Sequence, residues 1–165
     1  MSRQFFKKVE KRLSGDALLQ TDAATSQRMG RIRQIGTEPE LTLRRAATIL
    51  GLRYTTRNRD LPGSPDLANR SRRWAIFVHG CYWHRHAGCY KATTPRTNTQ
   101  FWLNKFASNV ARDAAATESL REAGYQVVTF WQCELDEGRS VARRLRNLAA
   151  RKRRASPAAG VKSDH

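Results

Sequence analysis

The sequence lacks any apolar run that approaches the roughly 20 residues needed for a membrane-spanning helix. Residues 1–13 are charged throughout and have none of the apolar core of a signal peptide. Cysteine is also scarce, and the odd number of three argues against a secreted fold held by disulfides. We therefore expect a cytoplasmic protein whose cysteines either bind a metal or are simply buried.

Acidic residues are few, with 14 Asp and Glu against 31 Lys and Arg, and the net charge is +17. Self-repulsion among these charges costs stability, so the excess indicates a polyanionic partner. Five basic residues against Asp164 give residues 151–165 a net charge of +4, which leaves +13 for residues 1–150. The main body is therefore basic, as expected of a nucleic-acid-binding protein. Charge alone does not distinguish an enzyme from a ribosomal-type binding protein.

The chain length of 165 residues suits one domain with a core of its own. Residues 1–25 mix basic and apolar residues without a periodic face, and we interpret them as a basic N-terminal arm. Residues 151–165 combine a basic run with Ser, Pro, Ala and Gly, which is typical of a disordered tail. Residues 26–150 are then the folded domain.

Helix and strand patterns follow one another from Thr37 onwards. Thr37 and Glu40 have the spacing of a capping box, and Gly51 is a natural stop for the helix that they begin. A second helix over 101–123 is expected to bury Leu103, Phe106, Val110, Ala114, Thr117 and Leu120. Strands are predicted at 52–56, 66–68, 74–78 and 125–131, and a basic helix at 140–153. One mixed sheet flanked by helices, an α/β fold, satisfies this order.

A Cys/His cluster lies in the irregular stretch 79–98. Cys81, His86 and Cys89 form a C-x4-H-x2-C pattern, and Cys133 follows the last predicted strand. Three thiolates and one imidazole make a complete tetrahedral zinc set, and a closed set of four ligands is typical of structural zinc. The alternative for Cys133 is a buried small apolar residue that binds no metal.

Two carboxylates, Glu40 and Asp66, occupy positions from which a sheet and a helix could bring them near His79. Phosphodiester cleavage needs a hard cation held by oxygen ligands that leave room for phosphate and water. Glu40 already has a structural role in the capping box, and Asp66 could be only an Asx-type turn residue. His79 and His84, which the zinc site does not need, could equally be solvated or form hydrogen bonds to its ligands.

Large aromatic residues lie within the same irregular stretch and just after it. Tyr82 and Trp83 lie between the cysteines and histidines, and Trp102 follows Phe101 at the start of a predicted helix. An aromatic wedge between base steps costs a few kcal/mol of unstacking, and stacking on a base returns about 1–3 kcal/mol. The cost is smallest where base pairing is already weak, as at a mismatch. The alternative for Trp102 is that it begins the core face of its helix.

Seven segments, in order between about Ser26 and Leu135, resemble one family closely. They are TEPE at 37–40, LPGSPD at 61–66, FVHGCYWHRHAGC at 77–89, TTPRTN at 93–98, FW at 101–102, NVARD at 109–113 and WQC at 131–133. The chain is similar in all of them to the very-short-patch-repair (Vsr) mismatch endonucleases. The HGCxWH block with its paired cysteines is highly specific, whereas LPGxPD alone is weak.

The resemblance implies a restriction-endonuclease-like fold with a structural zinc site. It also implies hydrolysis of one phosphodiester 5′ to the thymine of a T·G mismatch, the product of 5-methylcytosine deamination. The implied partner is double-stranded DNA that contains the mismatch, and further partners are repair proteins. We expect a monomeric bacterial enzyme that is nucleoid-associated when it is bound to DNA. Two alternatives are an endonuclease of the same fold with another specificity and a zinc module that binds DNA without cutting it.

The resemblance also implies a role for individual residues. Asp66 and the backbone carbonyl of Val78 would bind catalytic Mg²⁺, Glu40 and His79 would order the water around it, and His84 would transfer a proton. The structural zinc ligands would be Cys81, His86, Cys89 and Cys133. The wedge beside the mismatch would consist of Tyr82, Trp83 and Trp102. The family often has phenylalanine where Tyr82 stands, so its hydroxyl group needs a partner.

Overall fold

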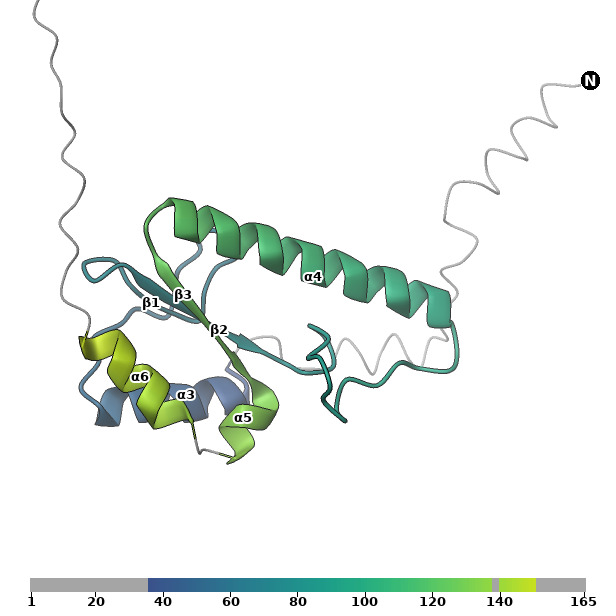
Figure 1. Cartoon of the computed structure of the whole chain (residues 1–165), viewed down its shortest axis with the longest axis horizontal. Helices are drawn as coiled ribbons and strands as arrows, with labels where there is room; N and C mark the ends of the chain where they lie inside the picture. Colours follow the sequence, from purple (N-terminus) through teal and green to yellow (C-terminus); the bar gives the residue numbers. More distant parts are fainter. Residues whose placement is uncertain (1–35, 138–139, 151–165) are drawn as a thin grey trace, which may run out of the picture.

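A computed structural model describes residues 36–137 and 140–150 of the chain (Figure 1). The predicted arm at 1–25 and the predicted tail at 151–165 lie outside the described residues. Within them, no helix is long and apolar enough to cross a membrane.

The centre of the fold is a three-stranded mixed sheet in the order β1-β2-β3. β1 (Leu67–Asn69) pairs antiparallel with β2 (Trp74–His79), and β2 pairs parallel with β3 (Gln126–Trp131). The predicted mixed sheet is therefore confirmed. The strand predicted at 52–56 is wrong, since only Thr55 forms an isolated bridge, to Ala68. Asn58 instead ties Thr55 to the loop that follows, because its side chain bonds Thr55 and the carbonyl oxygen of Pro65.

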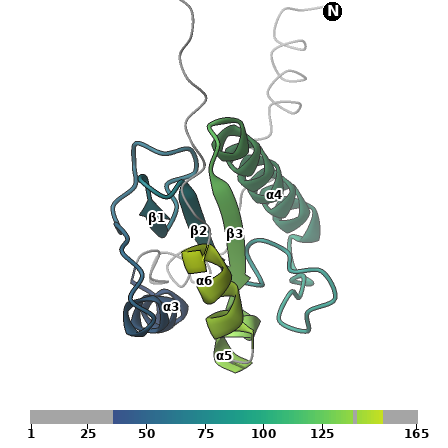
Figure 2. The same ribbon diagram turned by 60° about the vertical axis from the view of Figure 1, so that its left-hand side comes forward.

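Helices cover both faces of the sheet, as Figures 1 and 2 show. α4 (Thr99–Glu122) lies on one face, where Ala116 and Leu120 pack against Ala75 and Phe77 of β2. The other face carries α3 (Glu38–Ile49), α5 (Gln132–Glu137) and α6 (Val141–Ala150). The core on that side includes Leu43, Ile76, Phe130 and Leu145, all fully buried. α5 was not predicted.

The capping box predicted at the start of α3 is present. The carboxylate of Glu40 accepts hydrogen bonds from the backbone N–H groups of Gly36 (3.0 Å) and Thr37 (3.4 Å). Only 6% of Glu40 is exposed, and Arg44 pairs with it at 3.3 Å one turn further along. The first turn of α3 thus holds this buried carboxylate in place.

The buried face of α4 matches the prediction at Phe106 and Leu120 and differs from it elsewhere. Leu103 and Val110, which were expected in the core, are each 44% exposed. The residues that turn inward follow alternating spacings of four and three, and two of them are polar: Trp102, Phe106, Asn109, Asp113, Ala116 and Leu120. A search for apolar residues alone selects the neighbouring stripe, because Asn109 and Asp113 interrupt the true one.

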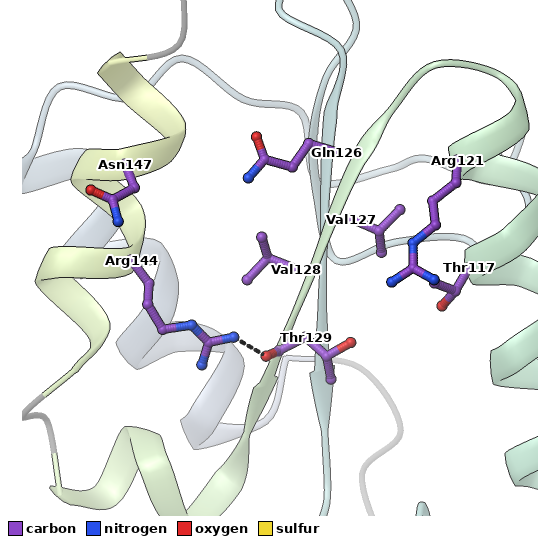
Figure 3. A pocket seen from close by; sticks show the side chains of 8 residues that line it. All are labelled: Thr117, Arg121, Gln126, Val127, Val128, Thr129, Arg144 and Asn147. Carbon is purple, nitrogen blue, oxygen red and sulfur yellow. Dashed lines mark hydrogen bonds between the residues drawn. The ribbon is translucent and has the colours of Figure 1, made fainter.

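The outer edge of β3 pairs with no other strand among the residues that the structure describes. Arg144 of α6 donates to the carbonyl oxygen of Thr129 at 2.6 Å (Figure 3). Glu134 of α5 accepts a hydrogen bond from the Trp131 backbone N–H at 2.9 Å and pairs with Arg144 at 3.0 Å. A polar groove of about 390 Å³ follows this edge between α4 and α6. Two side chains thus form hydrogen bonds with backbone groups to which a further strand would otherwise bind.

Candidate active site and metal centre

The parallel pairing of β2 and β3 brings two distant parts of the chain to one end of the sheet. His79 and Trp131 are partners in register, and each ends its strand. Cys81 lies two residues beyond His79, and Cys133 lies two residues beyond Trp131. The loop after β2 and the first turn of α5 therefore meet.

The four residues predicted to bind zinc lie together at this end. One ligand atom from each of Cys81, His86, Cys89 and Cys133 can be chosen so that all lie within 4.8 Å of one another. The Nδ1 atom of His86 is 3.2 Å from Sγ of Cys133 and 3.7 Å from Sγ of Cys81. Trp131 stacks on the His86 ring with centroids 4.3 Å apart, which fixes the ring plane.

The chemistry of this cluster fits a thiophilic dication. Burial, with the neighbouring Cys81 and Cys89 thiols, raises the pKa of Cys133 to about 12. Three thiolates and an imidazole are a complete ligand set for zinc. The structure brings the cysteines together instead of burying Cys133 alone.

Asp66 lies just before β1 and reaches across to β2. Its Oδ2 atom accepts a hydrogen bond from the backbone N–H of Val78 at 2.7 Å. Burial raises the pKa of Asp66 to about 6; the negative charge of Glu40 adds to the rise, and the bond from Val78 and the charge of Arg44 oppose it. Two carboxylates in one partly buried place, beside a strand end, are a donor set for a hard cation. Asp66 thus binds the backbone of Val78, and Glu40 lies near enough for its charge to raise the pKa of Asp66.

His79 and His84 form a second group with Asp113 of α4. The two imidazole rings are stacked, with centroids 4.0 Å apart and planes within 9°. His84 Nδ1 shares a hydrogen bond with a carboxylate oxygen of Asp113. Burial and then the charge of His84 lower the pKa of His79 to about 4, while Asp113 opposes this, so His79 is neutral at pH 7.

The second group suits proton transfer better than metal binding. Its ligand atoms lie within 4.8 Å of one another, but lone pairs of parallel imidazole rings run side by side and do not converge on one ion. A carboxylate on Nδ1 fixes the tautomer and leaves Nε2 for proton exchange. Asp113 was not singled out in the sequence. The four-and-three spacing of α4 contains the signal, since a carboxylate on a buried helix face needs a partner.

Both groups are attached to the end of β2, Asp66 through the backbone N–H of Val78 and His84 through the ring of His79. Val78 packs against the α3 side, whereas His79 contacts Phe77 and His84 on the α4 side. A cavity of about 600 Å³ is lined by His79, His84 and Asp113 among others, and Asp66 is not among its lining residues. The groups are joined through the backbone, because Asp66 binds the N–H of the residue that precedes His79.

The predicted aromatic wedge is a packed cluster. Tyr82 contacts Trp83, Trp102 and Phe106 with ring centroids 5.0–6.1 Å apart. Trp102 is only 5% exposed, and it belongs to the buried face of α4. The Nδ2 atom of Asn109 donates to the carbonyl oxygen of Trp83 at 3.1 Å. Tyr82 and Trp83 are half-buried and form the rim of the cluster.

Comparison with known proteins identifies the family. Residues 18–91 match the model of the family described as DNA mismatch endonuclease Vsr. The type II nicking enzyme V.XorIIP of Xanthomonas oryzae pv. oryzae is 38% identical over 73% of this chain and 88% of its own. The DNA mismatch endonuclease Vsr of Escherichia coli is 39% identical over 69% of this chain and 73% of its own. The chain therefore belongs to the Vsr family of DNA mismatch endonucleases.

Proposed function

We propose that the protein cuts one strand of duplex DNA 5′ to the thymine of a T·G mismatch and that it needs Mg²⁺. The observation that supports this best is the arrangement at the end of β2. A buried carboxylate, Asp66, binds the backbone of that strand at Val78, and an oriented imidazole, His84, stacks on its last residue, His79. Hydrolysis of a phosphodiester uses both a cation site and a proton-transfer group.

Asp66 and the backbone carbonyl of Val78 are the residues that would hold Mg²⁺. The ion would neutralise charge that develops on the scissile phosphate. The raised pKa of Asp66 agrees with this role, because a carboxylate that is costly to ionise in the empty fold gains most from a nearby cation. Glu40, whose carboxylate is held at the N-terminus of α3, is the residue that would order water near Asp66.

His84 is the proposed proton-transfer residue. It takes a proton from the attacking water, or returns one to the leaving oxygen, at Nε2, while Asp113 stabilises the charged ring through Nδ1. A positive charge on His84 disfavours a second positive charge on the stacked His79 ring. His79 therefore stays neutral and can accept a hydrogen bond from water. This division of roles makes Asp113 a positioning residue for His84.

Zinc is the proposed ion at Cys81, His86, Cys89 and Cys133. Bound there, it would cross-link the loop after β2 to α5 and so fix the loop that carries His84. The site has four protein ligands and keeps no position open for substrate, so its contribution is structural.

Tyr82, Trp83 and Trp102 are the proposed wedge for the mismatched step. Because Trp102 is nearly buried in the free protein, wedge insertion would require the aromatic cluster to open as DNA binds. Unstacking at a T·G step costs less than at a fully paired step, which supplies discrimination. We propose that the protein acts as a monomer and that other repair proteins work with it.

A second candidate is a nicking enzyme of the same fold with another sequence specificity. Several relatives are described as type II nicking enzymes, including V.XorIIP and V.NmeAIP of Neisseria meningitidis, the latter 34% identical over 68% of this chain. Discrimination between T·G and T·A at the same position separates the two candidates.

The test is a nicking assay on end-labelled duplexes that differ only in T·G or T·A at one position. The panel varies the flanking sequence, and each duplex is incubated with Mg²⁺ or with EDTA. We expect a single cut in the thymine strand of T·G duplexes, with Mg²⁺ only. Equal cutting of T·A duplexes would favour the second candidate, and cutting in EDTA would exclude the proposed cation.

A further inference from the structure

The loop that follows β2 reverses direction at Arg85. This residue has a φ of 56°, in the left-handed region of backbone conformation that residues other than glycine rarely adopt. The reversal separates two histidines that are only two positions apart. His84 turns to Asp113 and His79, whereas His86 turns to Cys81, Cys133 and Trp131.

The side chain of Arg85 is anchored at two places. Its Nη1 atom donates to the carbonyl oxygen of Thr93 at 2.9 Å, on the opposite side of the loop. Its guanidinium lies over the ring of Phe106 at 4.7 Å from the centroid, a cation–π contact with α4. These contacts offset the unfavourable backbone conformation and tie the loop to itself and to the helix.

Three consecutive loop residues dock on one face of α4. The carbonyl oxygen of Trp83 accepts from Asn109, His84 binds Asp113, and Arg85 covers Phe106. On the helix these partners are separated by three and four positions, so they form a single row. Arg85 and Trp83 therefore clamp the backbone on both sides of His84.

We propose that Arg85 is a positioning residue that holds His84 in hydrogen-bonding geometry with Asp113. The inference rests on the proposed proton transfer by His84. A catalytic side chain on a long loop loses rate when its geometry is loose, and an error of about 1 Å can reduce a rate about a hundredfold. Arg85 supplies rigidity where the backbone itself favours another conformation.

The experiment compares Arg85→Ala, Arg85→Gly and Arg85→Lys with the wild type. Glycine adopts the left-handed conformation freely, so it removes the anchors without the backbone penalty. Lysine keeps a cation for the Phe106 ring. Arg146→Ala is the matched control, because it removes the same charge from an exposed position on α6.

We expect single-turnover nicking at saturating DNA to fall about ten- to a hundredfold in both Arg85→Ala and Arg85→Gly. Arg85→Lys should recover part of the rate, and DNA affinity should change no more than in Arg146→Ala. In the free protein, the imidazole ¹⁵N–¹H correlation of His84 should broaden or shift in Arg85→Ala. The NMR result does not depend on nicking, so it remains informative if the proposed reaction is wrong.

Three outcomes would overturn the proposal. A wild-type rate with weakened DNA binding would make Arg85 a phosphate contact. A full recovery in Arg85→Gly would mean that only the backbone conformation matters. Loss of the metal from the cysteine cluster in Arg85→Ala, with a matching loss of folded protein, would make its role one of loop stability.

Discussion

At the scale of single residues, the ionised carboxylate of Asp66 lowers the free energy of unfolding when no metal ion is bound. Its pKa is raised from 3.8 to about 6, mainly by burial. The unfolded chain therefore releases this proton near pH 4, while the folded chain keeps it up to about pH 6. The folded state binds the proton more tightly, so the free energy of unfolding falls as pH rises through this range and stays lower above it.

We predict that Asp66→Asn separates stability from activity. Nicking should fall by about 10²–10³-fold, because an electrostatic contact to the transition state is lost, while DNA binding is retained. At pH 8 without divalent cations, the Tm should rise by about 2–4 °C, since the buried charge is gone and the amide oxygen can still accept from Val78. Nicking assays and thermal melts between pH 4 and 8 check both parts.

Asp60→Asn is the matched control, because Asp60 is an exposed carboxylate paired with Arg70. It should nick at the wild-type rate and should not gain stability. Nicking by Asp66→Asn near the wild-type rate would contradict the assignment of this residue. A Tm that depends on pH in Asp66→Asn as it does in the wild type would contradict the claim that the buried charge of Asp66 destabilises the fold.

At the scale of elements, local signals predicted more than long-range ones. The capping box of Thr37 and Glu40 correctly predicted the start of α3, because all of its hydrogen bonds lie within four residues. The strand at 52–56 failed because strand formation depends on a partner elsewhere, and the side chain of Asn58 ties Thr55 to the loop that follows.

The extent of α4 was predicted closely, and the burial of Phe106 and Leu120 was predicted correctly, but the rest of its buried face was not. Asn109 and Asp113 lie on the buried face because polar groups of the loop, the Trp83 carbonyl oxygen and His84, meet them there. No periodicity in a single helix reveals those partners. The cysteine spacing predicted the grouping of Cys81, His86, Cys89 and Cys133 better, since a ligand set constrains residue types directly.

Cys133→Ala tests the link between the loop after β2 and α5. We predict that bound zinc falls from about one equivalent per chain to well below that, and that the Tm falls with it. The comparison is Leu148→Ala, which removes a fully packed side chain of α6 and should cost about 2–5 kcal/mol with zinc retained. Zinc measured by atomic emission, alongside thermal melts, decides the matter. Unchanged zinc in Cys133→Ala would remove this residue from the ligand set.

At the scale of the whole molecule, the net charge of +17 favours association with the DNA phosphates. Each neutralised phosphate adds about −0.9 to the slope of log affinity against log salt. Deleting residues 151–165 removes a net charge of +4, so we predict a slope smaller by at most about 4 and weaker binding. The loss should be equal for T·G and fully paired duplexes, because phosphate contacts carry no sequence information.

Fluorescence anisotropy between 50 and 200 mM salt measures this effect. A chain of full length in which Arg151, Lys152, Arg153 and Arg154 are replaced by serine controls for chain length. A change in the preference for T·G over paired DNA would show that the segment takes part in recognition.

The outer edge of β3, where Glu134 and Arg144 bind the backbone, affects how the protein behaves in concentrated solution. In the part of the chain that the structure describes, β1 and β3 are both edge strands, and an unpaired edge such as that of β3 invites edge-to-edge joining of molecules into ordered aggregates. A strand from another molecule could extend the sheet here only after the side chains of Glu134 and Arg144 had released the backbone groups of Trp131 and Thr129. The same two side chains that fasten α5 and α6 to the sheet therefore also protect solubility.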